Sequence, residues 1–304
     1  MRLRPDRTPA PVRRLSTAAA GADTVYLVHP GALDAEVHRT LAAALPAGSG
    51  LTVLDLSALP EYWEAALTGG RAATTVEDLA GRLAAELLGA RAEDARAGGS
   101  PTGGSPTGDA RPYTLAGWSF GGVVAQALVE RLPAGQRPRR LVLLDSIAPT
   151  DAYKPSDEEL DPTLLLGWFA LYLGAKRGTP VAPDPERLAG ADVDRGLEAV
   201  LDAAVAAGAL KAGTPVFGLR KLYDTYVDGL LRNNRLTTPY EAVPSSVPLV
   251  LVTAEGSLIP DDPTLGWEPL APRGLTLHRS PGDHYTMLSR PDAAALIAQL
   301  VHAA

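Results

Sequence analysis

The sequence predicts an α/β fold with a mostly parallel central sheet, helices on both faces of the sheet and a long helical insertion. Apolar segments of strand length alternate with segments of helical periodicity along most of the 304 residues. Residues 139–145 read Arg-Arg-Leu-Val-Leu-Leu-Asp, a near-continuous apolar run that is typical of a strand buried on both faces in a parallel sheet. Residues 151–240 break the alternation, since helical patterns dominate and strand signals vanish there.

The amino-terminal residues 1–22 differ in composition from the rest of the chain. They carry five arginines, three prolines and a run of small residues, without an apolar block long enough for a secretory signal. Arg13 and Arg14 would suit a twin-arginine export signal, but residues 24–28 already read as a folded strand. We therefore expect residues 1–22 to be a linker or a disordered terminus that tethers an upstream domain, and we expect the protein to be cytoplasmic.

The overall composition excludes several classes of function. No segment reaches 18 uninterrupted apolar residues, so we expect no membrane span. The net charge of −7 argues against broad nucleic-acid binding. Cysteine is absent, which excludes disulfides, thiol chemistry and cysteine-ligated metals.

The expected elements follow one another in the order of an α/β chain. Residues 23–304 are expected to form one domain, with residues 151–240 inserted between two core strands as a helical lid. Residues 98–108 form a doubled low-complexity run of Gly, Ser, Pro and Thr, which predicts a surface loop. Periodicity predicts strands at 24–28, 51–56, 139–145, 247–253 and 275–279, and helices at 74–89, 159–173, 193–207, 216–235 and 291–301.

Residues 113–122 hold the strongest chemical signal in the chain. A short apolar strand, a Gly-x-Ser-x-Gly turn at 117–121 and the start of a helix form the pattern of a nucleophile elbow. The serine of such an elbow has a strained backbone, and glycines beside it let helix and strand pass closely. Ser119 is therefore the predicted nucleophile. An ordinary glycine turn is the alternative, but it would not require the strand before and the helix after.

A serine hydroxyl needs a base within hydrogen-bond reach and a third group that fixes the tautomer of that base. His284 follows the last predicted strand, where the chain order Ser…Asp…His places the base. His278 lies within that strand, His38 in a helix and His302 in the terminal tail. The sequence therefore favours His284.

The orienting acid has two candidates. Asp145 ends the strand that follows the predicted nucleophile helix, and functional groups of open α/β sheets gather at such carboxyl ends. Glu255 ends the next strand along and is the alternative. We favour Asp145, and we expect Asp283 to shape the loop that carries His284.

A tetrahedral intermediate needs two backbone donors aimed at its oxygen. The N–H of Phe120, one residue past the serine, is the first candidate. The second is expected in the turn after the first strand, where we choose Ala32, with His29 and Gly31 as alternatives. We find no carboxylate–histidine spacing for a metal and no phosphate-binding glycine loop, so we predict no metal and no cofactor.

Three segments together resemble the thioesterase domains of nonribosomal peptide and polyketide synthases. They are Gly-Trp-Ser-Phe-Gly-Gly at 117–122, Asp145 at the end of the following strand, and Pro-Gly-Asp-His-Tyr-Thr-Met-Leu at 281–288. The run Asp-Pro-Thr-Leu-Gly-Trp at 262–267 is similar to the terminal portion of peptide-synthetase thioesterases. The resemblance covers about residues 24–302.

The resemblance implies an α/β-hydrolase fold and a type I thioesterase with a Ser-His-Asp triad. A peptidyl or polyketidyl chain would arrive on the phosphopantetheine arm of an upstream carrier protein, pass to Ser119 and leave by macrocyclisation or hydrolysis. The His-Pro-Gly-Ala turn at 29–32 resembles the oxyanion loop of the family but lacks its common second glycine. This departure bears on the choice of Ala32.

The insertion is expected to shape the acyl pocket. Residues 164–172 hold more large apolar side chains than one solvent-facing helix needs. We expect Trp168 and Tyr223 to line the pocket, and plain packing within the fold is the alternative for each. Since cyclisation requires a pocket that keeps water away, these apolar residues favour cyclising release.

Basic residues on the predicted helix 216–235 form a candidate docking patch for the carrier protein. A solvated helix face is the alternative for each of them. The patch consists of Arg220, Lys221, Arg232 and Arg235.

Reasoning from the residues alone ends at acyl transfer by a serine. Two other functions therefore stay open. One is a stand-alone serine esterase or lipase-like hydrolase, against which the absent signal peptide and disulfides count mildly. The other is a non-catalytic binding module of the same fold, which would be expected to have lost at least one of Ser119, Asp145 and His284.

Overall fold

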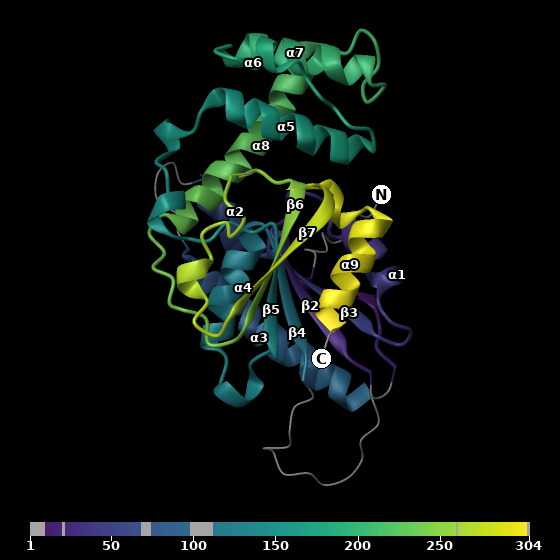
Figure 1. The fold of residues 1–304 in the computed structure, drawn as a ribbon, viewed down its shortest axis with the longest axis vertical. Helices are drawn as coiled ribbons and strands as arrows, with labels where there is room; N and C mark the ends of the chain where they lie inside the picture. The colour runs from purple at the N-terminus through teal and green to yellow at the C-terminus, as the bar shows by residue number, and fades with distance from the viewer. Residues whose placement is uncertain (1–9, 20–21, 68–73, 98–111, 260, 303–304) are drawn as a thin grey trace, which may run out of the picture.

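The computed structural model describes residues 10–19, 22–67, 74–97, 112–259 and 261–302. One sheet of seven strands runs through the middle of the molecule, in the order β1-β3-β2-β4-β5-β6-β7 (Figure 1). All neighbouring strands are parallel except β1, which is antiparallel to β3. The strands are β1 Val12–Ser16, β2 Thr24–His29, β3 Gly50–Asp55, β4 Thr114–Trp118, β5 Arg140–Leu144, β6 Leu249–Gly256 and β7 Leu275–Asp283.

The middle strands are covered on both faces, as parallel strands require. Every residue of β3 and of β4 is buried. One face packs against α3 and α4, and the other packs against α1 and α9. The helices that cover the sheet are α1 Arg39–Ala44, α2 Pro60–Leu67, α3 Val76–Ala97, α4 Phe120–Arg131 and α9 Pro291–His302. The expected α/β-hydrolase architecture of a mostly parallel sheet between helices is confirmed.

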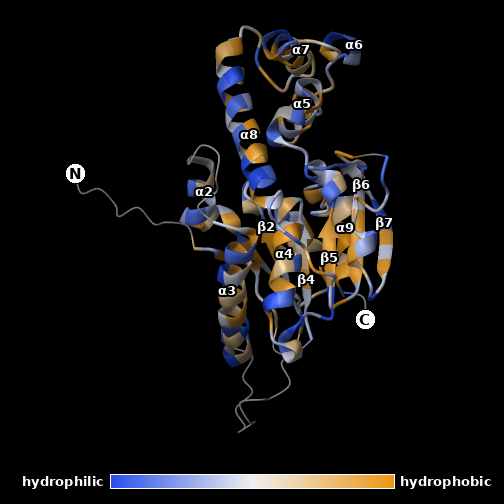
Figure 2. Ribbon diagram, turned by 90° about the vertical axis from the view of Figure 1, so that its left-hand side faces the viewer, coloured by the Kyte–Doolittle hydropathy of each residue, from blue (hydrophilic) through white to orange (hydrophobic). Residues whose placement is uncertain are grey.

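The chain between β5 and β6 is helical. Within residues 151–240 the structure has no strand among the residues that it describes, and Figure 1 places α6 and α7 farthest from the sheet, with α8 running back toward it. Figure 2 shows hydrophilic and hydrophobic residues interspersed along α8, while the strands are mostly hydrophobic. These helices are α5 Pro162–Arg177, α6 Pro185–Leu188, α7 Val193–Ala206 and α8 Val216–Thr237. That this segment acts as a lid stays a prediction.

The predicted amino-terminal linker is wrong for residues 12–16. These residues form β1, which pairs with β3 at the edge of the sheet, with Val12 opposite Leu54. Arg13 reaches across to Glu36 at 2.8 Å and to the buried Asp55 at 3.5 Å. The strand is only half-buried, so its arginines keep contact with solvent while they pair with carboxylates. Residues 1–9 lie outside the described residues, as does the low-complexity run at 98–108.

Among the described residues, none of the helices combines the length and the apolar character that crossing a bilayer requires.

Removing residues 1–16 tests the contribution of β1 to stability. We expect the free energy of unfolding, measured by urea denaturation, to fall by on the order of 2 kcal/mol. Several ladder hydrogen bonds of about 1 kcal/mol each are lost, and the chain entropy that is released offsets part of that loss. Removal of residues 1–9 alone is the matched control and should have the smaller effect. Equal stability of both shortened proteins would restore the linker interpretation.

Candidate active site

Ser119 stands at the turn between β4 and α4. Its backbone has φ 53° and ψ −131°, a conformation that costs a residue other than glycine roughly 1–3 kcal/mol. The Ser119 N–H donates a hydrogen bond of 3.0 Å to the carbonyl of Leu144, at the end of the neighbouring β5. The residue is half-buried, and its hydroxyl makes no hydrogen bond with any residue that the structure describes. The structure thus has the predicted strained turn between strand and helix at Ser119, in a half-buried setting.

Glycines make this turn sterically possible. A Cβ on Gly117 would lie 2.6 Å from the carbonyl oxygen of Gly121, so strand and helix touch through their backbones. A Cβ on Gly121 would overlap the carbonyl oxygen of Val28, and one on Gly122 would overlap the side chain of Ser146. The start of α4 therefore packs directly against the ends of β2 and β5.

Asp145 and His284 are brought together from residues 139 positions apart. His284 Nδ1 lies 2.7 Å from Asp145 Oδ2, and both side chains are nearly fully buried. The other oxygen, Oδ1, accepts a hydrogen bond of 2.9 Å from the Ala254 N–H. Because a carboxylate only accepts, the shared hydrogen belongs to Nδ1, which leaves Nε2 as the proton acceptor of the ring.

The competing acid lies elsewhere. Glu255 is exposed at the end of β6, and its carboxylate makes no hydrogen bond or ion pair with His284. Asp283 does what the sequence suggested, since its Oδ1 accepts hydrogen bonds from the N–H groups of Tyr285 (2.9 Å) and Thr286 (3.0 Å). It thereby holds the turn after β7 that presents His284.

Two tryptophans hold the loops of the site. The Trp118 indole N–H donates to the carbonyl of His284 at 3.0 Å, and the two rings lie 5.2 Å apart. The Trp267 indole N–H donates to the carbonyl of Ser146 at 2.7 Å, one residue after Asp145. Sequence reasoning gave neither of them a role, although both stand inside the segments that carried the resemblance.

The predicted oxyanion donors lie on two different turns. Phe120 is the first residue of α4, so its N–H has no acceptor within the helix. Ala32 lies exposed in the turn after β2, next to Gly31, whose φ is 86° and whose Cβ would come within 2.5 Å of Ser57. Both N–H groups belong to segments at the carboxyl edge of the sheet.

Comparison with known proteins gives the family. Residues 104–304 match the protein family described as Thioesterase domain. The chain belongs to this family. No curated protein matches the chain.

Solved structures of related proteins share the fold of this thioesterase domain. A four-domain nonribosomal peptide synthetase, holo-AB3403 bound to AMP and glycine, is 26% identical with a TM-score of 0.61, over 96% of this chain and 20% of that one. The chain thus spans a fifth of that synthetase. The Vlm2 thioesterase domain is 19% identical (TM-score 0.52; 96% and 97% coverage). The NocB thioesterase domain, in covalent complex with a fluorophosphonate nocardicin G analogue, is 23% identical (TM-score 0.52; 95% and 97%).

Trp168 and Tyr223 both pack on the same apolar cluster in this thioesterase domain. Tyr223 is buried, with its ring 5.3 Å from that of Phe169 in an edge-to-face contact between α8 and α5. Trp168 is half-buried against the same cluster of apolar residues. The packing alternative therefore describes Tyr223 well, while a pocket role for either residue stays a prediction.

The basic patch expected on α8 is only partly open to solvent. Arg232 is buried, with 5% of its surface exposed. Arg235 pairs with Asp157 at 2.6 Å. Arg220 pairs with Asp194 and with Asp224, at 2.6 and 2.9 Å. The predicted patch is therefore wrong at Arg232, because helical periodicity does not reveal which neighbours cover each face. Lys221 is exposed, and a docking role for it and for the ion-paired Arg220 and Arg235 stays a prediction.

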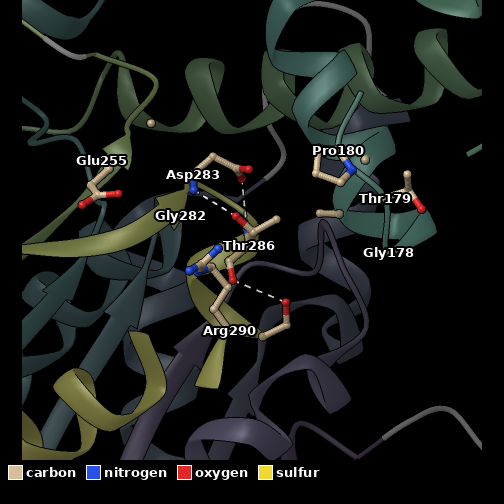
Figure 3. Close-up of a pocket in the computed structure, with 12 residues that line it drawn as sticks. Gly178, Thr179, Pro180, Glu255, Gly282, Asp283, Thr286 and Arg290 are labelled. Atoms are coloured by element: carbon tan, nitrogen blue, oxygen red, sulfur yellow. Dashed lines mark hydrogen bonds between the residues drawn. The ribbon is translucent and has the colours of Figure 1, made fainter. Parts of the chain in front are cut away.

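A cavity of about 650 Å³ lies beside the site, between the carboxyl end of α5 and the loop that carries His284 (Figure 3). Gly178, Thr179 and Pro180 line it from one side, and Asp283 and Thr286 line it from the other. Ser119, Asp145 and His284 are not among the residues that line this cavity. The cavity therefore adjoins the back of the histidine loop.

Two buried histidines, His29 and His38, lie near the turn after β2. His38 Nε2 is 3.0 Å from His29 Nδ1, and His29 Nε2 is 2.8 Å from the carbonyl of Leu33. Because a carbonyl only accepts, His29 donates from Nε2 and receives a hydrogen bond from His38 Nε2. The His29 ring also stacks on Trp118 at 5.5 Å. The sequence predicts only a helical position for His38 and does not predict its pairing with His29.

Burial lowers the pKa of both histidines below the ordinary value. At His38 the neighbouring His29 adds to this lowering of the pKa. At His29 the hydrogen bond to the Leu33 carbonyl and the carboxylates of Asp55 and Asp34 act against the lowering, and Arg13 acts with it. The lowering prevails, so both rings are neutral in the folded protein near pH 7. The unfolded chain takes up their protons first as the pH falls below about 6.5.

Stability should therefore decline on the acid side of neutrality. Between pH 7 and pH 5 we expect the free energy of unfolding to decrease by at most about 1.4 kcal/mol per pH unit for each histidine that stays neutral when folded. The variant His38→Gln keeps a donor toward His29 but cannot titrate, so its slope should be about half as steep. Urea denaturation at several pH values measures the slope for the unaltered protein and for the variant. Parallel slopes for the two proteins would show that His38 does not contribute.

Proposed function

We propose that this thioesterase domain breaks an acyl thioester through an acyl-enzyme on Ser119. The observation that carries the proposal is the buried 2.7 Å hydrogen bond between Asp145 and His284, at the sheet edge where the strained Ser119 lies. His284 Nε2 takes the hydroxyl proton while Ser119 Oγ attacks the thioester carbonyl. The proton then passes to the departing thiolate, which leaves as a thiol and frees the base.

The charge that develops on the thioester oxygen needs donors placed in advance. We propose the N–H groups of Phe120 and Ala32 for this role. The N-terminal end of α4 supports the first, because its unpaired N–H groups and the helix dipole favour negative charge. These residues supply the whole reaction, so we propose no metal and no cofactor of the domain itself.

The proposed substrate is a peptidyl or polyketidyl chain on the phosphopantetheine thioester of a carrier protein, which would precede this domain. The likeness to a four-domain nonribosomal peptide synthetase supports it, as does the family match. A stand-alone esterase would use the same residues on an oxygen ester and is the alternative. A non-catalytic module is the weaker alternative, because Ser119, Asp145 and His284 are all retained.

Release requires a second nucleophile at the acyl-serine, either water or a group of the acyl chain itself. The sequence argument for cyclisation depended on apolar side chains around the acyl group. Two of them, Phe169 and Tyr172, instead pack on Tyr226 of α8: the rings of Tyr172 and Tyr226 stack at 4.8 Å, and Phe169 contacts Tyr226 at 5.6 Å between ring centres. Ser119 is half-buried, so these contacts do not exclude water from it. We propose hydrolysis for soluble substrates, with macrocyclisation as the alternative.

Replacing the nucleophile tests the mechanism. Incubation with an acyl thioester should give an intact mass increased by the acyl group, located on Ser119 by peptide mapping. Ser119→Ala should lose the adduct and several orders of magnitude in turnover, since triad members act as a unit. Unchanged turnover in Ser119→Ala would refute the proposed function.

The acid is tested by a matched pair of carboxylates at the ends of neighbouring strands. Asp145→Asn should reduce turnover by on the order of 10⁴, by analogy with other triads in which the tautomer is lost. Glu255→Gln removes an exposed carboxylate nearby and should change turnover little. A silent Asp145→Asn with a crippled Glu255→Gln would reverse the assignment.

The release route is read from products. A linear acyl thioester that carries a terminal amine or hydroxyl should give the linear acid, which is one water heavier than the ring. Mass spectrometry of the products, for substrates of several chain lengths, measures the amounts of linear acid and of ring. A ring as the main product at any of these lengths would show that the domain excludes water after all.

A further inference from the structure

The hydroxyl of Tyr62 joins two segments that are far apart in the sequence. Tyr62 lies on α2 and is fully buried. Its oxygen is 2.8 Å from the carbonyl of Pro30, in the turn after β2. It is also 2.8 Å from the side-chain amide of Asn233 and 3.0 Å from Arg232 Nη2, both on α8. One phenol thus connects the helical segment with the turn that holds Ala32.

The three contacts fit the hydrogen-bonding capacity of a phenol. The Pro30 carbonyl only accepts, so it takes the single hydroxyl hydrogen. Arg232 only donates, and the amide of Asn233 can be turned over so that it donates as well, because its two ends are assigned from the hydrogen-bond network. Burial also raises the pKa of Tyr62, which keeps the hydroxyl protonated at all physiological pH values. The hydroxyl then donates one hydrogen bond and accepts two, which satisfies its full hydrogen-bonding capacity.

Arg232 has an unusual environment for a buried cation. In the part of the chain that the structure describes, no carboxylate pairs with it, and its Nε has no hydrogen-bond partner. Its guanidinium lies over the rings of Tyr62 and Trp63, at 4.0 and 4.6 Å. A buried guanidinium without a carboxylate costs free energy, so its remaining contacts matter the more. The bond to Tyr62 is therefore a main attachment of this part of α8 to α2.

The turn after β2 is held at both of its ends. Tyr62 binds the carbonyl of Pro30, and His29 binds the carbonyl of Leu33 at 2.8 Å. Ala32 lies between these two fixed peptides. The Tyr62 ring also stacks on Phe120, with 6.1 Å between ring centres and 10° between planes. Tyr62 therefore contacts both segments that carry the proposed oxyanion donors.

We propose that Tyr62 is a positioning residue that couples the placement of α8 to the geometry of the oxyanion donors. This inference depends on the proposed function, since it assigns a purpose to donors at Phe120 and Ala32. When α8 moves away, Tyr62 loses the bonds from Arg232 and Asn233, and its hold on the Pro30 peptide weakens. The Ala32 N–H then turns away from the developing charge. Both N–H groups, of Phe120 and of Ala32, are therefore in place to stabilise the charge only while α8 packs against α2.

The variant Tyr62→Phe keeps the ring on Phe120 and removes only the hydroxyl. Tyr113→Phe is its matched control, because Tyr113 is equally buried and also donates to a backbone carbonyl, that of Gln136 at 2.9 Å. With an acyl thioester we expect kcat of Tyr62→Phe to fall about tenfold to a hundredfold, with KM changed less than about twofold. Labelling of Ser119 by a fluorophosphonate, which forms a tetrahedral adduct, should slow by a similar factor. Tyr113→Phe should retain both rates.

The coupling to α8 is tested through Arg232. Arg232→Met should lower kcat in the otherwise unchanged protein, and Arg232→Lys, which keeps a donor, should recover part of the loss. In the Tyr62→Phe background, Arg232→Met should have no further effect, because the connection is already broken. Losses that multiply would show that Arg232 acts independently of Tyr62 and would overturn the coupling.

The outcomes separate this inference from the proposed function. If the unaltered protein is labelled at Ser119 and turns over thioester while Tyr62→Phe matches Tyr113→Phe, the inference is wrong and the function stands. If the unaltered protein neither labels nor depends on Ser119, both fall. Should Tyr62→Phe fail to fold, as judged by urea denaturation, Arg232→Met decides alone: a kcat equal to that of the unaltered protein refutes the inference.

Discussion

The close approach of the start of α4 to the ends of β2 and β5 is the constraint on which the whole site depends. Gly121 lies against the Val28 carbonyl and Gly122 against Ser146, so any side chain at either position would separate the helix from the sheet. This contact places the serine turn between the turn after β2 and the turn after β5. Three segments that are remote in the sequence thereby meet at one edge.

Strain at this edge is concentrated where the chemistry is proposed. Of the three non-glycine residues with positive φ among those described, two are Ser119 (53°) and Asp145 (42°), and the third is Leu265 (46°). Such conformations cost roughly 1–3 kcal/mol each and persist only where the surroundings determine them. Trp118 and Trp267 contribute to those surroundings. The Trp118 indole N–H donates to the carbonyl of His284 itself, and the Trp267 indole N–H donates to the carbonyl of Ser146, one residue after Asp145.

The sequence predicted the features that depend on local patterns. The sheet, the elbow of Ser119 and the loop of His284 each have a signature within about ten residues, and chain order then favoured Asp145. Prediction from the sequence failed where the structure of a segment depends on residues far away in the chain. The sequence predicts a linker at residues 12–16 because this half-exposed strand with two arginines lacks an alternating apolar pattern. The sequence also predicts a surface charge at Arg232, because nothing near it in the chain shows that Tyr62 and Trp63 of α2 cover it.

The two arginines of β1 lie on the outermost strand of the sheet. The next strand inward, β3, is buried at every residue, so without β1 it would become a flat apolar edge with unpaired backbone groups. Such edges recruit strands from other molecules. Arg13 binds Glu36, and Arg14 binds Glu93 at 2.9 Å, which places charge along the outermost strand. Charge along an edge strand disfavours its pairing with a strand of another molecule.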